Sequence, residues 1–214
     1  MKPLFHINSK VIFFNEHPTP IQGMLDYDWL CGKKSPCIVA IVNPKRSGFH
    51  KCFFGPKEIV IPVFKTIKQA TNSFKKADIF INFASTRSSF KSSEEALQIN
   101  SIKTLVLVAE GIPENQTREL IRLAKSNNKW IIGPATVGAI KVGAIRIGYS
   151  GGSSENIIDS KLYQKGSVGV VTVSGGMSNE IYNIVNKNTD GLNEGVAVGG
   201  DSFPGSTLLD NIIR

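Results

Sequence analysis

The sequence is poor in cysteine and histidine, and this scarcity bounds its chemistry. Its three cysteines, Cys31, Cys37 and Cys52, are an odd number and contain no Cys-x-x-Cys pair. None stands beside histidines at zinc-ligand spacing. We therefore expect reduced cysteines, no metal site and a cytoplasmic protein.

The chain also has no long apolar run. No segment approaches the roughly 20 apolar residues of a membrane helix, and the run Val11–Phe14 is too short for a signal peptide. Hydrophobic residues nevertheless make up 41% of the 214 residues and charged residues only 20%. That balance excludes a disordered chain, and the length predicts one large domain or two small ones.

The charge is unbalanced toward the basic side. The sequence has 25 Lys and Arg against 17 Asp and Glu, a formal net charge of +8. Such a surface admits nucleic acid, an anionic membrane or a phosphorylated ligand as partner. The basic residues are dispersed and no nucleic-acid recognition motif occurs, so nucleic acid is the least favoured partner, and no membrane partner is expected.

Short apolar runs alternate with segments of helical periodicity through the first part of the chain. The runs are continuously apolar, as expected for strands buried on both faces. Strands are predicted at 11–14, 37–43, 59–63, 78–83, 104–109 and 130–133, and helices at 21–30, 65–76, 93–100 and 114–127. This order predicts βαβ units and a parallel sheet in an α/β fold.

The composition changes between residues 133 and 166, where Gly, Pro, Ser and Asn accumulate and no long periodic segment occurs. We expect loop-rich structure and a linker there. Strands are then predicted at 168–173 and 195–198, and helices at 178–187 and 206–213. The predicted division is a first domain at 1–152, a linker at 153–166 and the beginning of a second domain at 167–214.

The first βα turn is the first candidate site, because ligands of open α/β sheets bind outside the carboxyl ends of the strands. Thr19 fits an N-cap, Pro20 the first helical position and Gln22 the third, a capping box. A helix start here suits a phosphate, and the alternative is an ordinary capped helix. No Gly-x-Gly-x-x-Gly accompanies it, which argues against a standard dinucleotide site.

Polar loops follow the other predicted strands. Lys45 and Arg46 follow the second strand and could meet a nucleotide phosphate or form a solvated basic loop. The later loops contribute hydroxyls, a guanidinium and a carboxylate, from Ser85, Arg87, Ser88 and Glu110. A second capping box is predicted at Ser92 and Glu95. Together these loops predict a binding crevice at one edge of the sheet.

The segment from Ser174 to Glu180 has the sharpest local pattern. It follows an apolar strand and opens a helix with two glycines, Gly175 and Gly176. The glycines leave backbone N–H groups accessible to an anion, and Ser174 and Ser178 could add hydroxyl donors. The alternative is a tight turn with serine caps.

Several motifs occur together along the chain, in an order that matches a known family. They are Ile81-Asn82-Phe83-Ala84-Ser85, Glu110-Gly111-Ile112-Pro113, Gly133-Pro134-Ala135-Thr136-Val137-Gly138, the Ser174–Glu180 segment, Gly199-Gly200-Asp201 and Pro204-Gly205-Ser206. The set resembles the acyl-CoA synthetase superfamily, and the Gly-Gly-Met-Ser-Asn-Glu form points to its ATP-citrate lyase branch rather than the succinate enzyme. The resemblance runs from Val11 to Arg214.

The resemblance implies a Rossmann-like CoA-binding domain followed by an incomplete flavodoxin-like ligase domain. CoA phosphates would meet the first helix, Lys45 or Arg46 would lie near the adenosine phosphates, and the pantetheine would pass Glu110. The implied CoA-binding residues are Thr19, Pro20, Ile21, Gln22, Lys45, Arg46, Ser85, Arg87, Ser88, Val108, Ala109 and Glu110.

In the second domain the resemblance implies a helix that grips a phosphohistidine and citrate. The residues of that site would be Ser174, Gly175, Gly176, Met177, Ser178 and Asn179, with Glu180 in a supporting catalytic position near the histidine. Citryl-CoA, and then acetyl-CoA and oxaloacetate, would form from citrate, CoA and ATP through phosphohistidine and citryl-phosphate.

The departures from the family pattern limit what the chain does alone. None of His6, His17 and His50 stands in the family's phosphohistidine loop, and the ATP-grasp region is absent. ATP and magnesium would therefore be bound by missing segments or a partner chain of an oligomer. We expect a CoA-binding fragment or subunit of such an enzyme, inactive by itself. The alternative is a non-catalytic CoA- or nucleotide-binding module.

Overall fold

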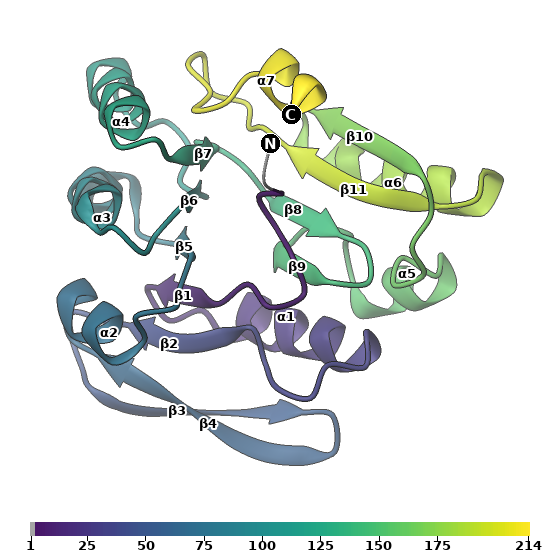
Figure 1. Ribbon diagram of the computed structural model, residues 1–214, viewed down its shortest axis with the longest axis horizontal. Coiled ribbons are helices and arrows are strands. Elements are labelled where there is room, and N and C mark those ends of the chain that lie inside the picture. The colour runs from purple at the N-terminus through teal and green to yellow at the C-terminus, as the bar shows by residue number, and fades with distance from the viewer. Residues whose placement is uncertain (1–2) are drawn as a thin grey trace.

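A seven-stranded, mostly parallel sheet forms the larger part of the protein, in a computed structural model that describes residues 3–214 (Figure 1). Its strand order is β3-β4-β2-β1-β5-β6-β7, and only the edge strand β3 runs antiparallel. The strands are β1 (Val11–Phe14), β2 (Ile38–Val42), β3 (Gly48–Phe54), β4 (Lys57–Phe64), β5 (Ile79–Asn82), β6 (Thr104–Leu107) and β7 (Trp130–Ile132).

Helices cover both faces of this sheet. Helix α1 (Pro18–Leu30) packs on one face, where Ile21, Met24 and Leu25 meet Val11 and Phe13. The other face is covered by α2 (Ile67–Ser73), α3 (Thr86–Gln98) and α4 (Glu114–Ser126). Strands β1, β5 and β6 are buried along their whole length, which explains why all but Asn82 and Thr104 among their residues are apolar.

A second, four-stranded sheet has the order β10-β11-β8-β9. Its strands are β8 (Gly138–Lys141), β9 (Ile145–Gly148), β10 (Val168–Thr172) and β11 (Leu192–Ala197). Helices α5 (Ser154–Asp159), α6 (Gly175–Asn188) and α7 (Leu208–Ile213) accompany it. The α/β class predicted from the sequence is therefore confirmed, including the parallel pairing of most strands.

The two sheets share a core around α1. Ile145 and Ile147 of β9 belong to the same buried cluster as Ile21 and Met24 of α1. Figure 1 shows α1 between the purple and blue strands of the larger sheet and the green strands β8 and β9. This packing places the first turns of α1 against the loops of the second sheet.

Residues 138–148 were expected to be loop, and that expectation is wrong. They form the antiparallel pair β8 and β9, so the second sheet takes two strands from within the range predicted as the first domain. Each strand has only four residues, too few to establish a period. Their pairing also depends on Gly138, whose φ of +110° and close approach to Ile147 O require glycine. The division into domains remains a prediction.

Two predicted helix starts are also wrong. Helix α1 begins at Pro18 with His17 as N-cap, so Thr19 and Gln22 form no capping box. Helix α3 begins after Ser85, which puts Ser92 inside the helix rather than at its cap. Strand β3 was not expected at all, because its antiparallel pairing with β4 leaves one of its faces exposed. Within residues 3–214, no helix combines the length and apolar character needed to cross a bilayer.

Candidate functional site

A cleft of about 570 Å³ lies between the first turns of α1 and the loop that leads from β9 to α5. Four residues predicted from the sequence line it: Thr19, Pro20, Gln22 and Asn179. The tertiary structure therefore brings part of the predicted CoA set together with one residue of the predicted citrate site. Their roles in binding remain predictions.

The N-terminus of α1 offers few backbone donors to a ligand. Pro18 and Pro20 both lack an N–H, and the N–H of Ile21 donates to His17 O at 3.3 Å. The Ile21 side chain is fully buried in the core and faces away from the cleft. Of the first turn, Thr19 is exposed and lines the cleft, and unlike its two proline neighbours it has a backbone N–H.

The side-chain amide of Gln22 forms hydrogen bonds within the protein. Its Nε2 donates to Phe53 O at 2.9 Å and to Asp26 Oδ1 at 2.7 Å. Its Oε1 accepts from Phe53 N at 3.0 Å. Gln22 thus ties α1 to the edge strand β3, which leaves little of its hydrogen-bonding capacity for a ligand.

Aromatic side chains join three loops beside this cleft. Asn15, with a φ of +68°, donates from Nδ2 to Phe83 O at 3.0 Å. The Phe83 ring packs against His17 at 5.1 Å and edge-on against Tyr149 at 5.7 Å between ring centroids. These contacts join the carboxyl ends of β1 and β5 to the end of β9. The ends of β1 and β5 flank the point where the strand order reverses, the usual ligand position in such sheets.

The loop after β2 is organised by Glu16. Its carboxylate accepts from Arg46 Nε at 2.9 Å and Asn43 Nδ2 at 3.2 Å, and its Oε1 lies 2.6 Å from His50 Nδ1. Burial by itself raises the pKa of Glu16, but hydrogen bonds from Arg46, His50 and Asn43 outweigh it and lower the pKa. Arg46 is therefore paired internally, whereas Lys45 is exposed.

After β5, the surface carries Ser85 at the N-cap of α3 and Arg87 and Ser88 in its first turn. The hydroxyls of Ser85 and Ser88 lie 3.2 Å apart, and Ser85 caps α3 without a side-chain hydrogen bond. Thr86 donates from its hydroxyl to Glu110 O at 2.9 Å, which holds the start of α3 beside the loop after β6.

The three predicted pantetheine contacts after β6 lie in different surroundings. Val108 and Ala109 are half-buried and pack against opposite faces of the sheet. The side chain of Glu110 is exposed. None of the three lines the cleft beside α1.

The N-terminus of α6 has the capped glycine start that the sequence predicts. Ser174 is the N-cap and accepts from Met177 N at 3.4 Å. A Cβ on Gly175 would lie 2.6 Å from Val137 Cγ1, whereas a Cβ on Gly176 would meet no atom within 4 Å. The open side at Gly176 leaves the helix start accessible to an anion.

The remaining residues of this segment differ in availability. Ser178 is buried and donates to Gly175 O at 2.6 Å, so its hydroxyl is not free for a ligand. Asn179 Oδ1 accepts from Gly151 N at 2.8 Å at the cleft. Met177 and Glu180 are exposed.

Sequence reasoning missed the cation of the cleft, Arg146. It lies in β9, is 5% exposed and contributes to the cleft wall. Burial lowers its pKa to about 10, although Tyr27 and Asp26 oppose the shift. An arginine between two isoleucines, Ile145 and Ile147, is the signal that could have revealed a buried cation.

Comparison with known proteins confirms the resemblance over the whole chain. No family model matches. ATP-citrate synthase beta chain protein 1 of Oryza sativa subsp. japonica is 53% identical over 211 residues, covering 99% of this chain and 35% of that protein. ATP-citrate synthase of Homo sapiens is 47% identical over 213 residues, covering 99% of this chain and 19% of that protein. The chain thus spans about a third or less of these relatives.

Solved structures agree with the sequence matches. ATP citrate lyase from Methanothrix soehngenii, in complex with citrate and coenzyme A, superposes with a TM-score of 0.97 at 50% identity. The match covers 99% of this chain and 34% of that one. An acetyl-coenzyme A synthetase of Ca. Korarchaeum cryptofilum matches with a TM-score of 0.64 at 15% identity, which shows a common fold.

Proposed function

We propose that this chain, homologous over nearly its whole length to one segment of ATP-citrate lyase, binds CoA and contributes to an ATP-dependent synthesis of citryl-CoA. The observation that carries the proposal is the 50% identity and TM-score of 0.97 with a lyase whose structure holds citrate and coenzyme A. The match covers both the larger sheet and the α6 segment, because it includes 99% of the chain.

The cleft beside α1 supports the CoA part of the proposal. It lies next to the point of strand-order reversal and has Thr19 on one wall and Arg146 on another. The exposed side chains of Lys45 and Arg87 and the net charge of +8 suit a ligand with several phosphates. The internal bonds of Gln22 and Arg46 indicate that these two residues shape the site more than they contact the ligand.

The start of α6 supports the acyl part of the proposal. Accessible N–H groups at Gly175 and Gly176, together with the positive end of the helix dipole, stabilise a phosphoryl group or carboxylate. Asn179 connects this helix to the cleft, and Glu180 is exposed on the same helix. In this proposal Glu180 receives the histidine of another segment. The role of the chain's own residues is to bind and orient, while the phosphohistidine, ATP and magnesium belong to other segments or a partner chain.

The proposed partners follow from the same homology. They are CoA, citrate and an ATP-grasp segment or subunit, in an oligomer located in the cytoplasm. The three cysteines are unpaired, which supports a reducing compartment.

Titration calorimetry of the purified chain with CoA and, separately, with NAD tests the ligand class. We expect heat of binding with CoA and none with NAD. Binding of NAD without binding of CoA would contradict the proposal.

The alternative is a CoA-binding module without a catalytic role. One observation favours keeping it: the side chains of Gln22 and Arg46 are bonded internally. Mixing the chain with a partner that supplies ATP-grasp and phosphohistidine segments separates the two. Formation of citryl-CoA from citrate, CoA and MgATP supports the enzyme, and CoA binding with an inactive mixture supports the module.

A further inference from the structure

Arg146 is a buried cation with few partners. Its Nη1 donates to Gly23 O at 3.3 Å and its Nη2 to Gly152 O at 2.6 Å. Its Nε is buried and has no hydrogen-bond partner. Only two of the five N–H donors of the guanidinium therefore have an acceptor, and both acceptors are neutral carbonyls.

No carboxylate forms an ion pair with this charge: among residues 3–214, no Asp or Glu lies within ion-pair distance of Arg146. Asp26 lines the same cleft and attracts the guanidinium only at longer range, while its Oδ1 accepts from Gln22 Nε2 at 2.7 Å. Since buried charges are normally paired, an unpaired guanidinium at a cavity wall indicates a charge that a ligand completes.

The surrounding cleft fits that interpretation. Helix α1 has a glycine at the point of contact, and a Cβ on Gly23 would lie only 3.0 Å from Arg146 Nη1. Thr19, Ser153 and Asn179 line the same cleft and add hydroxyl and amide groups to it. The cleft of about 570 Å³ admits a ligand of several heavy atoms to these donors.

We propose that Arg146 is the anion-recognising residue of this cleft and binds a carboxylate or phosphate group of the ligand. The inference deepens the proposed function and rests on it for the identity of the ligand. The group could belong to citrate or to a phosphate of CoA, because a guanidinium forms bidentate bonds with both. Through its bonds to Gly23 and Gly152, Arg146 also holds α1 against the loop before α5 while it binds.

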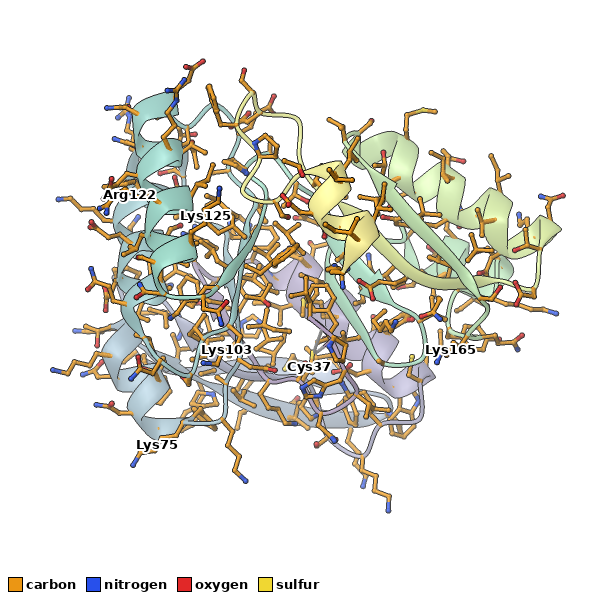
Figure 2. All side chains as sticks on the ribbon, turned by 45° about the horizontal axis from the view of Figure 1, so that its top comes forward. Cys37, Lys75, Lys103, Arg122, Lys125 and Lys165 are labelled. Carbon is orange, nitrogen blue, oxygen red and sulfur yellow. The ribbon has the colours of Figure 1, made fainter. Side chains whose placement is uncertain are left out.

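Calorimetric titration of the whole chain with three separate probes tests this assignment: citrate, inorganic pyrophosphate and CoA. Arg146→Met removes the charge and keeps much of the side-chain volume. Arg122→Met is the control, because Arg122 is an exposed arginine on α4 (Figure 2) that does not line the cleft. We expect Arg146→Met to raise the dissociation constant of at least one probe by tenfold or more. We expect Arg122→Met to change each dissociation constant by less than twofold.

The probes distinguish the source of the anion. Loss of citrate binding with unchanged pyrophosphate binding assigns Arg146 to the carboxylate, and the reverse result assigns it to the phosphates. Equal affinities of wild type and Arg146→Met for every probe would overturn the assignment, and CoA binding by both proteins would leave the proposed function intact. Binding of citrate or pyrophosphate through Arg146 without binding of CoA would contradict the proposed function and support the subsite.

A second variant keeps the test valid if Arg146→Met does not fold. Gly23→Ala retains the charge but pushes Nη1 from its position, and alanine is favourable in a helix. We expect Gly23→Ala to raise the dissociation constant of the same probe severalfold and to leave the melting temperature unchanged or higher. Unchanged affinity for every probe in a folded Gly23→Ala protein, together with unchanged affinity in a folded Arg146→Gln protein, would also overturn the assignment.

Discussion

The side chain of Gln22 forms two hydrogen bonds with the backbone of Phe53, accepting from its N–H at 3.0 Å and donating to its carbonyl at 2.9 Å. The two residues are 31 positions apart and join α1 to the edge strand β3. Because an edge strand leaves backbone groups unpaired, Gln22 takes the place of a neighbouring strand at this point. The first helix is thereby fixed beside the cleft.

Replacing Gln22 with alanine is expected to lower the free energy of unfolding by about 1–2 kcal/mol, because two backbone groups of Phe53 lose their partner. Urea denaturation measures the change. Gln98→Ala is the control, since Gln98 is exposed at the end of α3, and it should change stability by less than about 0.5 kcal/mol. Equal effects of the two substitutions would show that the bonds to Phe53 contribute nothing.

The Glu16 cluster predicts an acid-sensitive contribution to stability. The pKa of Glu16 is lowered in the folded protein from an ordinary value of 4.5. Its ionised form therefore stabilises the fold above pH 4.5, and this contribution is lost as the pH falls through the lower folded-state pKa. Glu16→Gln should be less stable than wild type at pH 7, and the difference should shrink below pH 4.5.

Urea denaturation at pH 7 and near pH 3.5 measures that difference. Glu95→Gln provides the control, because Glu95 is exposed on α3. A gap between wild type and Glu16→Gln that stays constant from pH 7 to pH 3.5 would contradict the role of the Glu16 carboxylate.

Asn82 positions the start of α3, where Ser85 is the N-cap and Arg87 lies in the first turn. Its fully buried Nδ2 lies 2.8 to 3.1 Å from three oxygen atoms of Ser89, Ser92 and Ser93, and its Oδ1 accepts from Ala84 N. Asn82→Ala should cost roughly 2–4 kcal/mol of unfolding free energy, because buried donors and acceptors lose their partners.

The same substitution should raise the dissociation constant for CoA if the start of α3 contacts the ligand. Denaturation and calorimetry measure the two effects, and Asn100→Ala, at an exposed position, is the matched control. A stable Asn82→Ala protein with unchanged thermal melting would show that the network is dispensable.

Two adjacent glycines at the start of α6 should respond differently to alanine. A Cβ at position 175 would lie 2.6 Å from Val137 Cγ1. Gly175→Ala should therefore lower the free energy of unfolding by about 1–3 kcal/mol or displace the helix start. Gly176→Ala has open space and should be neutral or up to about 1 kcal/mol more stable. Thermal and urea denaturation compare the pair.

Under the proposed function, a bulkier side chain at Gly175 should also abolish phosphohistidine formation in a mixture with the partner segments. The affinity for CoA should remain within twofold of wild type. Loss of both together would argue against separate sites for CoA and the phosphoryl group.

The parallel sheet could be predicted because the mainly apolar composition of its strands reflects their burial on both faces. Ile79–Asn82 and Thr104–Leu107 are buried on both faces, and each is followed by a helix. The turn from Ser174 into α6 was equally readable, since an N-cap serine and two glycines act within a few residues of one another. The helix itself begins three residues before the predicted start. Glycine has a low helix propensity, so the sequence placed the start after the two glycines, but Gly175 packs closely against Val137 and is helical in the structure.

Partners distant in the sequence could not be predicted in this way. The sequence suggested phosphate contacts for Gln22 and Arg46, but the structure pairs them with Phe53 and Glu16. It gave no indication that Arg146 would lie against Gly23, 123 positions away.

The sequence alone therefore determined the α/β class, the order of most elements and the homology that its motifs carry. Only the tertiary structure decided which strands complete the second sheet, and that α1 is enclosed between the two sheets. It also decided that Arg146 meets Thr19 and Asn179 at one cleft. The physical reason is that periodicity and capping act over a few neighbouring residues, whereas burial of a charge and closure of a cleft depend on contacts between distant ones.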